Sequence, residues 1–188
     1  SGYSLESAPE DFDWRALGAV TEVKNQAYCG SCWPFSTAAG LEGTPYLRTG
    51  ELRSMSPQQL VSCSTANYGC DGGWPFVAMQ YVEHFGGLAH WSDWPYKNLC
   101  MDDACGKGAY DGTPTCRRET VNRVIRSGNG SAISGWQMVA MGAAYESDLM
   151  KLALLRNGPL AAVMNANGME HYIHGVVGCD ADGDCEAG

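Results

Sequence analysis

The feature that most constrains this chain is the segment 26–36, which reads Gln-Ala-Tyr-Cys-Gly-Ser-Cys-Trp-Pro-Phe-Ser. Apolar residues interleaved with small ones continue after Ser31 and predict a helix that buries most of its surface, with Cys32 in its first turn. A cysteine attacks a carbonyl group as the thiolate, and the unpaired N–H groups and positive dipole end of a helix N-terminus stabilise that anion. The segment therefore predicts that Cys32 is a nucleophile.

Other interpretations of Cys32 compete with this one. A cysteine can be a small buried hydrophobic residue or half of a disulfide, and Cys29 with Cys32 forms a C-x-x-C pair of the kind found in redox and zinc sites. A redox pair would follow a buried strand, and residues 20–26 are too polar for one. A four-cysteine zinc site would need a second C-x-x-C, which the wider spacing of Cys63 and Cys70 does not provide.

Composition limits the class of protein. A chain of 188 residues can bury a sizeable core in one domain or in two small lobes. No apolar run approaches the roughly 20 residues that a membrane helix needs. A formal net charge of -9 disfavours a nucleic-acid surface and an anionic-membrane surface, since both select clustered Lys and Arg. We expect a soluble globular protein with neither partner.

The cysteines indicate an oxidising compartment. The chain has 9 of them, and an odd number leaves one thiol after all possible disulfides have formed. Cys100 and Cys105 are close together in a loop-like stretch and are expected to pair. Asn129 begins an N-glycosylation sequon. The chain opens on Ser1 without a signal peptide, so we interpret it as a processed, mature form.

The remaining pattern indicates helices first and strands later. Residues 1–25 are expected to be extended and residues 88–115 to form a loop. Cap residues and apolar spacing predict further elements, namely helices at 56–61, 76–85 and 147–157 and a strand at 160–164. This order is typical of an α+β protein with segregated lobes. Pro45, inside the first helix, predicts a kink or a helix end just before it.

Several blocks of the sequence resemble the papain-like cysteine proteases, and among them the cathepsin L-like branch. The blocks are Asp13–Arg15, Val20–Gln26, Cys29–Trp33, Ser56–Cys63, Gly69–Gly73 and Gly158–Val163. The resemblance implies a papain-like two-lobe fold of the α+β class. A mainly helical lobe would cover residues 1–118, and an incomplete β-barrel lobe would cover residues 119–188.

The resemblance also implies roles for individual residues. Cys32 would attack the scissile carbonyl and form a thioester acyl-enzyme, while the Gln26 amide and the Cys32 N–H hold the oxyanion. Gly72 and Gly73 would pair with the backbone of an extended substrate. The walls of an apolar substrate pocket would be Trp74, Pro75 and Val163. The implied disulfides are Cys29–Cys70 and Cys63–Cys116, whereas Cys179 and Cys185 either bridge each other or await another partner.

The general base is where the sequence departs from the family, because the family's histidine and asparagine blocks are absent from their expected context. His84 and His90 fall in the first lobe and are predicted to be structural. His171 and His174 lie at the family's usual distance from Cys32, yet the segment around His174 aligns better with one that precedes the histidine block. We expect the histidine beyond residue 188, either in a separate light chain or in a truncated segment; in a pseudoenzyme it would be lost.

An acidic run near the end of the chain is similar to a calcium-binding loop. Asp180, Asp182 and Asp184 resemble the start of one, but Cys185 occupies the position that requires glycine. A solvated acidic loop is the better interpretation, and we expect neither a metal nor a cofactor.

The sequence thus predicts a cysteine endopeptidase that prefers an apolar residue two positions before the cut. The alternative is a catalytically inactive papain-like module retained for binding or scaffolding. Expected partners are polypeptide substrates, a disulfide-linked or associated C-terminal light chain, and a propeptide or protein inhibitor. The expected location is lysosomal, vacuolar or secreted.

Overall fold

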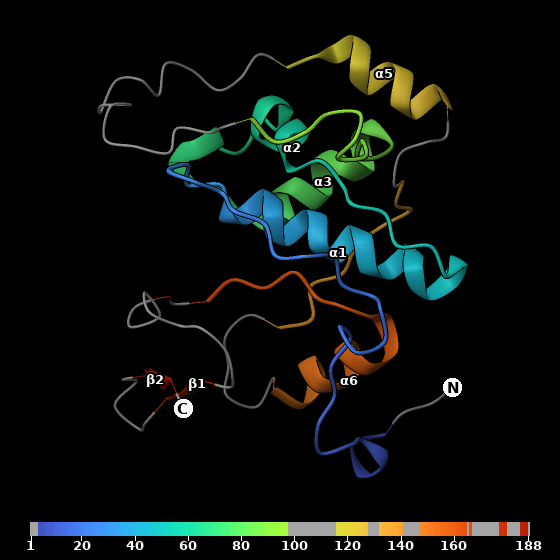
Figure 1. Cartoon of the computed structure of the whole chain (residues 1–188), viewed down its shortest axis with the longest axis vertical. Coiled ribbons are helices and arrows are strands. Elements are labelled where there is room, and N and C mark those ends of the chain that lie inside the picture. Colours follow the sequence, from blue (N-terminus) through green and yellow to red (C-terminus); the bar gives the residue numbers. More distant parts are fainter. Residues whose placement is uncertain are drawn as a thin grey trace.

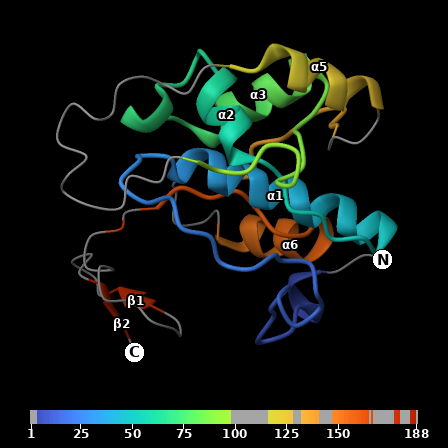
Figure 2. The ribbon, with the colours of Figure 1, turned by 45° about the horizontal axis from the view of Figure 1, so that its top comes forward.

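Helix α1 (Cys32–Thr49) is the central element of this computed structural model. Helices α2 (Pro57–Cys63) and α3 (Pro75–Phe85) lie on one side of it, and α6 (Ser147–Asn157) lies on the other (Figure 1). Helix α5 (Arg118–Ser127) covers α2 and α3, and the rotated view of Figure 2 shows the same order. The short elements are the 3-10 helices η1 (Leu5–Ser7) and η2 (Gly69–Asp71) and the strands β1 (Val177–Cys179) and β2 (Cys185–Ala187).

The structure describes residues 4–97, 116–127, 132–140, 147–164, 166, 177–179 and 185–187. None of the helices in these ranges is both long and apolar enough to cross a membrane.

The hydrophobic core forms where α1, α2 and α3 meet. Its cluster of buried side chains comprises Trp33, Ala38, Leu41, Met55, Leu60, Cys63, Ala78, Tyr81, Val82, Leu88, Ala89, Trp94 and Val121. Each large apolar side chain buried in this way contributes about 1.5–3 kcal/mol. Val121 brings α5 onto the same core, although the sequence analysis did not predict that helix.

Local sequence explains where the predicted helices begin and end. Ser56 caps α2, because its hydroxyl accepts a hydrogen bond from the Gln59 N–H at 3.2 Å, and Pro57 follows at the first helical position. Helix α3 ends at Gly86, which adopts the left-handed conformation that favours glycine. These two helices and α6 confirm the predictions for 56–61, 76–85 and 147–157.

Of the two outcomes predicted for Pro45, the helix end is wrong, because α1 continues past this proline as one α-helix, and the kink stays a prediction. Packing on both sides of Pro45 accounts for the difference. Gly43 lies so close to Pro159 that a Cβ atom there would be 2.6 Å from the proline ring. The Tyr46 hydroxyl donates to the Leu17 carbonyl at 2.8 Å. Contacts of this kind offset the cost of about 3 kcal/mol that proline imposes on a helix interior.

The strand predicted at 160–164 is also wrong, since these residues have no regular secondary structure. The segment instead docks on α1 through one side chain. Ser36 Oγ donates to the Ala162 carbonyl at 3.1 Å and accepts from the Ala162 N–H at 3.1 Å. A serine hydroxyl thus satisfies the backbone groups that a neighbouring strand would otherwise pair.

The described strands form one antiparallel pair. Val177 lies opposite Ala187, and Cys179 lies opposite Cys185. A pair of three-residue strands does not make a barrel, so the incomplete barrel and the division into lobes at residues 118 and 119 stay predictions.

A buried carboxylate fastens the N-terminal segment to α1. Glu42 is only 2% exposed, and it accepts hydrogen bonds from the Thr21 hydroxyl at 2.6 Å and from the Met55 N–H at 2.7 Å. Lys24 Nζ lies 3.3 Å from the Glu42 carboxylate. Three segments of the chain therefore meet at one charged group that solvent does not reach.

We expect Glu42→Ala to lower the free energy of unfolding by about 3–5 kcal/mol, because Lys24 and the Met55 N–H lose their buried partner. Denaturant unfolding followed by tryptophan fluorescence measures the change. Glu51→Ala is the control: it removes the same side chain from the exposed pair with Arg53, where solvent screens the charges, and should change stability little. Equal effects of the two substitutions would contradict the anchoring role of Glu42.

Candidate active site

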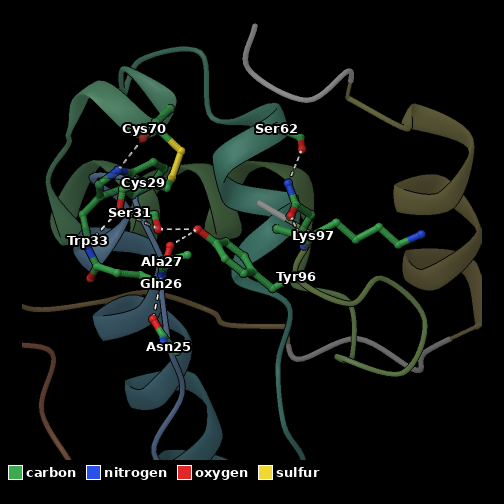
Figure 3. Close-up of a disulfide and its surroundings, with 12 residues drawn as sticks. Asn25, Gln26, Ala27, Cys29, Ser31, Trp33, Ser62, Cys70, Tyr96 and Lys97 are labelled. Atoms are coloured by element: carbon green, nitrogen blue, oxygen red, sulfur yellow. Dashed lines mark hydrogen bonds between the residues drawn. A yellow bond between two sulfur atoms is a disulfide. The ribbon is translucent and has the colours of Figure 1, made fainter. Parts of the chain in front are cut away.

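A disulfide holds the two loops of the candidate site together. Cys29 is bonded to Cys70, and the Gly30 N–H donates to the Cys70 carbonyl at 2.9 Å (Figure 3). The first loop leads into α1, and the second leads from η2 to Gly72 and Gly73. Two parts of the chain that are distant in sequence therefore face one another.

Cys32 is the first residue of α1, and its side chain is exposed. Its sulfur is not part of a disulfide. The other side chains of this first turn, Trp33 and Pro34, are buried. The local geometry places a solvent-accessible thiol at the positive end of a long helix, where an anion is stabilised.

The helix itself does not use the N–H groups at the start of α1. Ser31 occupies the N-cap position, yet its hydroxyl makes no capping hydrogen bond to the helix. Pro34 has no N–H, so the donors left in the first turn are those of Cys32 and Trp33. Neither has a hydrogen-bond acceptor within the described part of the chain. Such donors are what a developing oxyanion requires.

Gln26 lies in the loop before the disulfide and is partly buried. Its Nε2 donates to the Cys29 carbonyl at 2.8 Å, which leaves the second amide hydrogen for another acceptor. Its own main-chain carbonyl accepts from the Tyr96 hydroxyl at 2.9 Å. Ala27 next to it has a φ of 53°, and its N–H donates to the Asn25 side chain at 2.7 Å. Side-chain and main-chain bonds thus both hold this residue.

The predicted substrate-binding glycines lie in a tight turn after η2. Gly72 has a φ of 116°, in the region that favours glycine. A Cβ on Gly73 would lie 2.5 Å from Asn67 Oδ1 and 2.9 Å from the Trp33 ring. Asn67 is buried, and its side chain accepts from the Trp74 N–H at 2.8 Å. The buried amide therefore fixes the backbone of this turn, and only glycine fits beside it.

The three residues predicted to line an apolar pocket differ in their surroundings. Trp74 is 53% exposed, and its ring centre lies 6.0 Å from that of Phe76, which in turn lies 6.5 Å from that of Trp136. Pro75 is buried as the first residue of α3. Val163 is 64% exposed and follows the segment that Ser36 docks on α1. Their shared role as pocket walls stays a prediction.

The second described disulfide joins Cys63 to Cys116 and links the end of α2 to the start of α5. Both disulfides are the pairs that the family resemblance implied. The predicted Cys100–Cys105 bridge, the Asn129 sequon and the acidic residues of the calcium alternative lie outside the described residues. Within the described ranges, no cluster of His, Cys, Asp or Glu could hold a metal ion.

Neither of the two described histidines forms a hydrogen bond with Cys32. His84 lies on α3 with its ring edge-on to Phe85 at 4.8 Å. His90 lies 3.5 Å from the Arg53 guanidinium, and partial burial together with that charge lowers the pKa of His90 below its usual value. His171 and His174 lie outside the described residues. The described part of the site therefore contains a candidate nucleophile and candidate oxyanion donors, and neither described histidine is placed as their general base.

Sequence reasoning missed the residues that support the site from behind, above all Tyr96 and Asn67. Both are buried and polar, and each holds a loop backbone through its side chain. The sequence gives only weak local indications of these roles: Tyr96 follows Trp94-Pro95, and Asn67 precedes a glycine-rich turn. Neither signal says which distant carbonyl or N–H the side chain will meet.

Comparison with known proteins agrees with this arrangement. The family described as papain family cysteine protease matches residues 8–187. The probable cysteine protease RD19B of Arabidopsis thaliana is 38% identical over 180 residues, which cover 91% of this chain and 44% of the relative. Cathepsin K of Mus musculus is 36% identical over 179 residues, covering 93% of this chain and 48% of the relative.

A solved structure of recombinant stem bromelain precursor superposes with a TM-score of 0.63 at 30% identity, covering 82% of this chain and 44% of that one. The chain thus spans less than half the length of each of these relatives. The match over nearly all of its residues, together with the papain-like fold of that neighbour, shows that the chain belongs to the papain family of cysteine proteases.

Proposed function

We propose that this chain carries the nucleophile of a cysteine endopeptidase that cleaves polypeptides through a thioester on Cys32. The observation that carries the proposal is the exposed, unbridged Cys32 thiol at the start of α1, beside N–H groups that have no described acceptor. Membership of a family of cysteine proteases supports the same reaction.

The chemistry would proceed in two stages. The Cys32 thiolate attacks the scissile carbonyl carbon, and the π electrons of that carbonyl move to its oxygen, which the Gln26 amide and the Cys32 N–H stabilise. The C–N bond then breaks, the leaving amine takes a proton from an imidazolium, and the thioester remains. In the second stage water gives a proton to the imidazole and its oxygen attacks the thioester carbon; the C–S bond then breaks, which releases the carboxylic acid and restores the thiolate and the imidazolium.

We propose that a segment or second chain outside the described residues supplies this imidazole, since neither His84 nor His90 is bonded to Cys32. The short span relative to the relatives favours this source. A catalytically inactive module for binding or scaffolding is the second candidate, and the missing base in the described site is the observation that favours it.

In this proposal the enzyme recognises the main chain of the substrate through hydrogen bonds and one side chain through an apolar pocket. Gly72 and Gly73 would form hydrogen bonds with an extended peptide, and Trp74, Pro75 and Val163 would line an apolar pocket. The exposed Trp74 ring supports an apolar preference.

Expected partners are polypeptide substrates, a C-terminal light chain, and a propeptide, as the precursor form of the bromelain neighbour suggests. The disulfides favour a lysosomal, vacuolar or secreted location.

Alkylation separates the two candidate functions. For the protein as purified, with any polypeptide that copurifies, iodoacetamide should label Cys32 at mildly acidic pH much faster than it labels glutathione. Cys32→Ala should neither label at that position nor cleave a peptide reporter, whereas its unfolding should be nearly unchanged because the side chain is exposed. Peptide mass mapping identifies the labelled residue. Labelling no faster than that of glutathione would favour the inactive module.

Gly73→Ala tests the substrate-binding turn. The new methyl group would collide with Asn67 and Trp33 and shift the turn, so we expect KM for an extended peptide to rise about tenfold and the unfolding free energy to fall by about 1–3 kcal/mol. Gly135→Ala is the matched control, because a Cβ there has nothing within 4 Å. An unchanged KM in Gly73→Ala would remove the turn from substrate binding.

A further inference from the structure

A buried tyrosine connects the two halves of the proposed oxyanion site. Tyr96 is 5% exposed, and its hydroxyl donates to the main-chain carbonyl of Gln26 at 2.9 Å. The same hydroxyl lies 2.7 Å from Ser31 Oγ. Figure 3 shows this oxygen between the two residues. Gln26 carries one proposed oxyanion donor, and Ser31 immediately precedes the residue that carries the other.

The direction of the hydrogen bonds follows from the number of hydrogens. A tyrosine hydroxyl has one hydrogen, and the Gln26 carbonyl can only accept, so that hydrogen goes to Gln26. The Ser31 hydrogen then goes to the Tyr96 oxygen at 2.7 Å, which is a much shorter contact than the one to the Cys29 carbonyl at 3.4 Å. The result is a directed chain from Ser31 through Tyr96 to Gln26, in which each bond polarises the next.

This chain has a consequence for the helix N-terminus. A serine at the N-cap ordinarily turns its hydroxyl toward an N–H of the first turn. Here the hydroxyl of Ser31 faces Tyr96 and makes no capping bond. The first-turn donors of α1 therefore keep no side-chain acceptor of their own. A water-excluded tyrosine thus keeps the donors open and holds the Gln26 loop at a fixed distance from them.

The ring of Tyr96 is itself well supported. It packs edge-on against Phe35 of α1 at 4.8 Å. The next residue, Lys97, donates its N–H to the buried Gln58 side chain of α2 at 2.7 Å. The hydroxyl is therefore held by α1 and α2 rather than by the loop alone.

We propose that Tyr96 is a positioning residue for the oxyanion site, an inference that rests on the proposed function. It acts through Gln26 and Ser31 and touches no substrate atom. Misplacement of a catalytic donor by a fraction of an ångström to 1 Å costs up to about a hundredfold in rate. Losing the Tyr96 hydrogen bond, which only positions an oxyanion donor, should lower the rate less than losing the donor itself.

Tyr96→Phe tests this proposal, because it removes one oxygen and keeps the ring. A peptide aldehyde forms a tetrahedral adduct with an oxyanion, whereas iodoacetamide alkylates the thiol without one. In the protein as purified with any copurifying polypeptide, we expect the aldehyde inhibition constant to rise about tenfold and kcat to fall about tenfold. KM and the rate of Cys32 alkylation should change less than about twofold.

Two comparisons exclude a merely structural effect. Tyr81→Phe removes the same atom from another buried tyrosine, whose hydroxyl accepts from Gln59 at 3.3 Å, and should leave aldehyde binding unchanged. In a Gln26→Ala background, Tyr96→Phe should weaken aldehyde binding by no more than about threefold further, because the Gln26 donor is already gone and only the bond to Ser31 remains to be lost. An equal effect in both backgrounds would overturn the proposal, as would an equal loss of aldehyde binding and alkylation.

The outcomes also separate this proposal from the proposed function. A wild-type protein that neither cleaves peptides nor binds the aldehyde refutes the endopeptidase and this inference with it. An active wild type with unaltered aldehyde binding in Tyr96→Phe refutes the inference alone. If Tyr96→Phe does not fold, Ser31→Ala takes its place with an expected rise in the inhibition constant of about threefold, and an unchanged constant overturns the proposal.

Discussion

The Cys29–Cys70 crosslink is the constraint on which the site depends, because it joins the loop before the proposed nucleophile to the turn that would receive substrate. On one side, the Gln26 amide bonds to the Cys29 carbonyl. On the other, Gly72 and Gly73 follow Cys70 directly. A disulfide closing a loop of this length stabilises a fold by about 3–4 kcal/mol through the unfolded state. Its larger contribution here is to position the site, since the proposed nucleophile, oxyanion donor and substrate turn are all close in sequence to the two bridged cysteines.

Buried side-chain amides extend this rigidity away from the disulfide. Gln58 and Gln59 are almost fully buried on α2, and they accept from the Lys97 N–H and the Ala89 N–H at 2.7 and 2.8 Å. The loop that carries Tyr96 is thereby attached to a helix at two points. Such groups cost free energy when buried unless they are paired. Every buried side-chain polar atom in the described residues has a partner, so the helical core is also a framework for loops.

Secondary structure was predicted correctly where neighbouring residues determine it, and wrongly where contacts from distant parts of the chain determine it. The cap of α2 by Ser56 and the glycine after α3 are short-range signals, and both helices were predicted close to their observed bounds. Helix α5 was missed, although Val121 begins an apolar spacing that could have indicated it. The helix end before Pro45 and the strand at 160–164 were predicted wrongly, because in each case contacts from another part of the chain outweighed the local preference.

By itself the sequence determined the chemical identity of this protein: a cysteine at the head of a helix, a glutamine before it, and a glycine pair beyond, in spacings that resemble one protease family. These properties are readable because they depend on residue type and on neighbours a few positions apart. Tertiary structure alone decided that Tyr96 meets both Gln26 and Ser31, and that Asn67 closes over Gly73. Hydrogen bonds between segments far apart in the chain exist only once the core has packed, since packing sets the distances on which they depend.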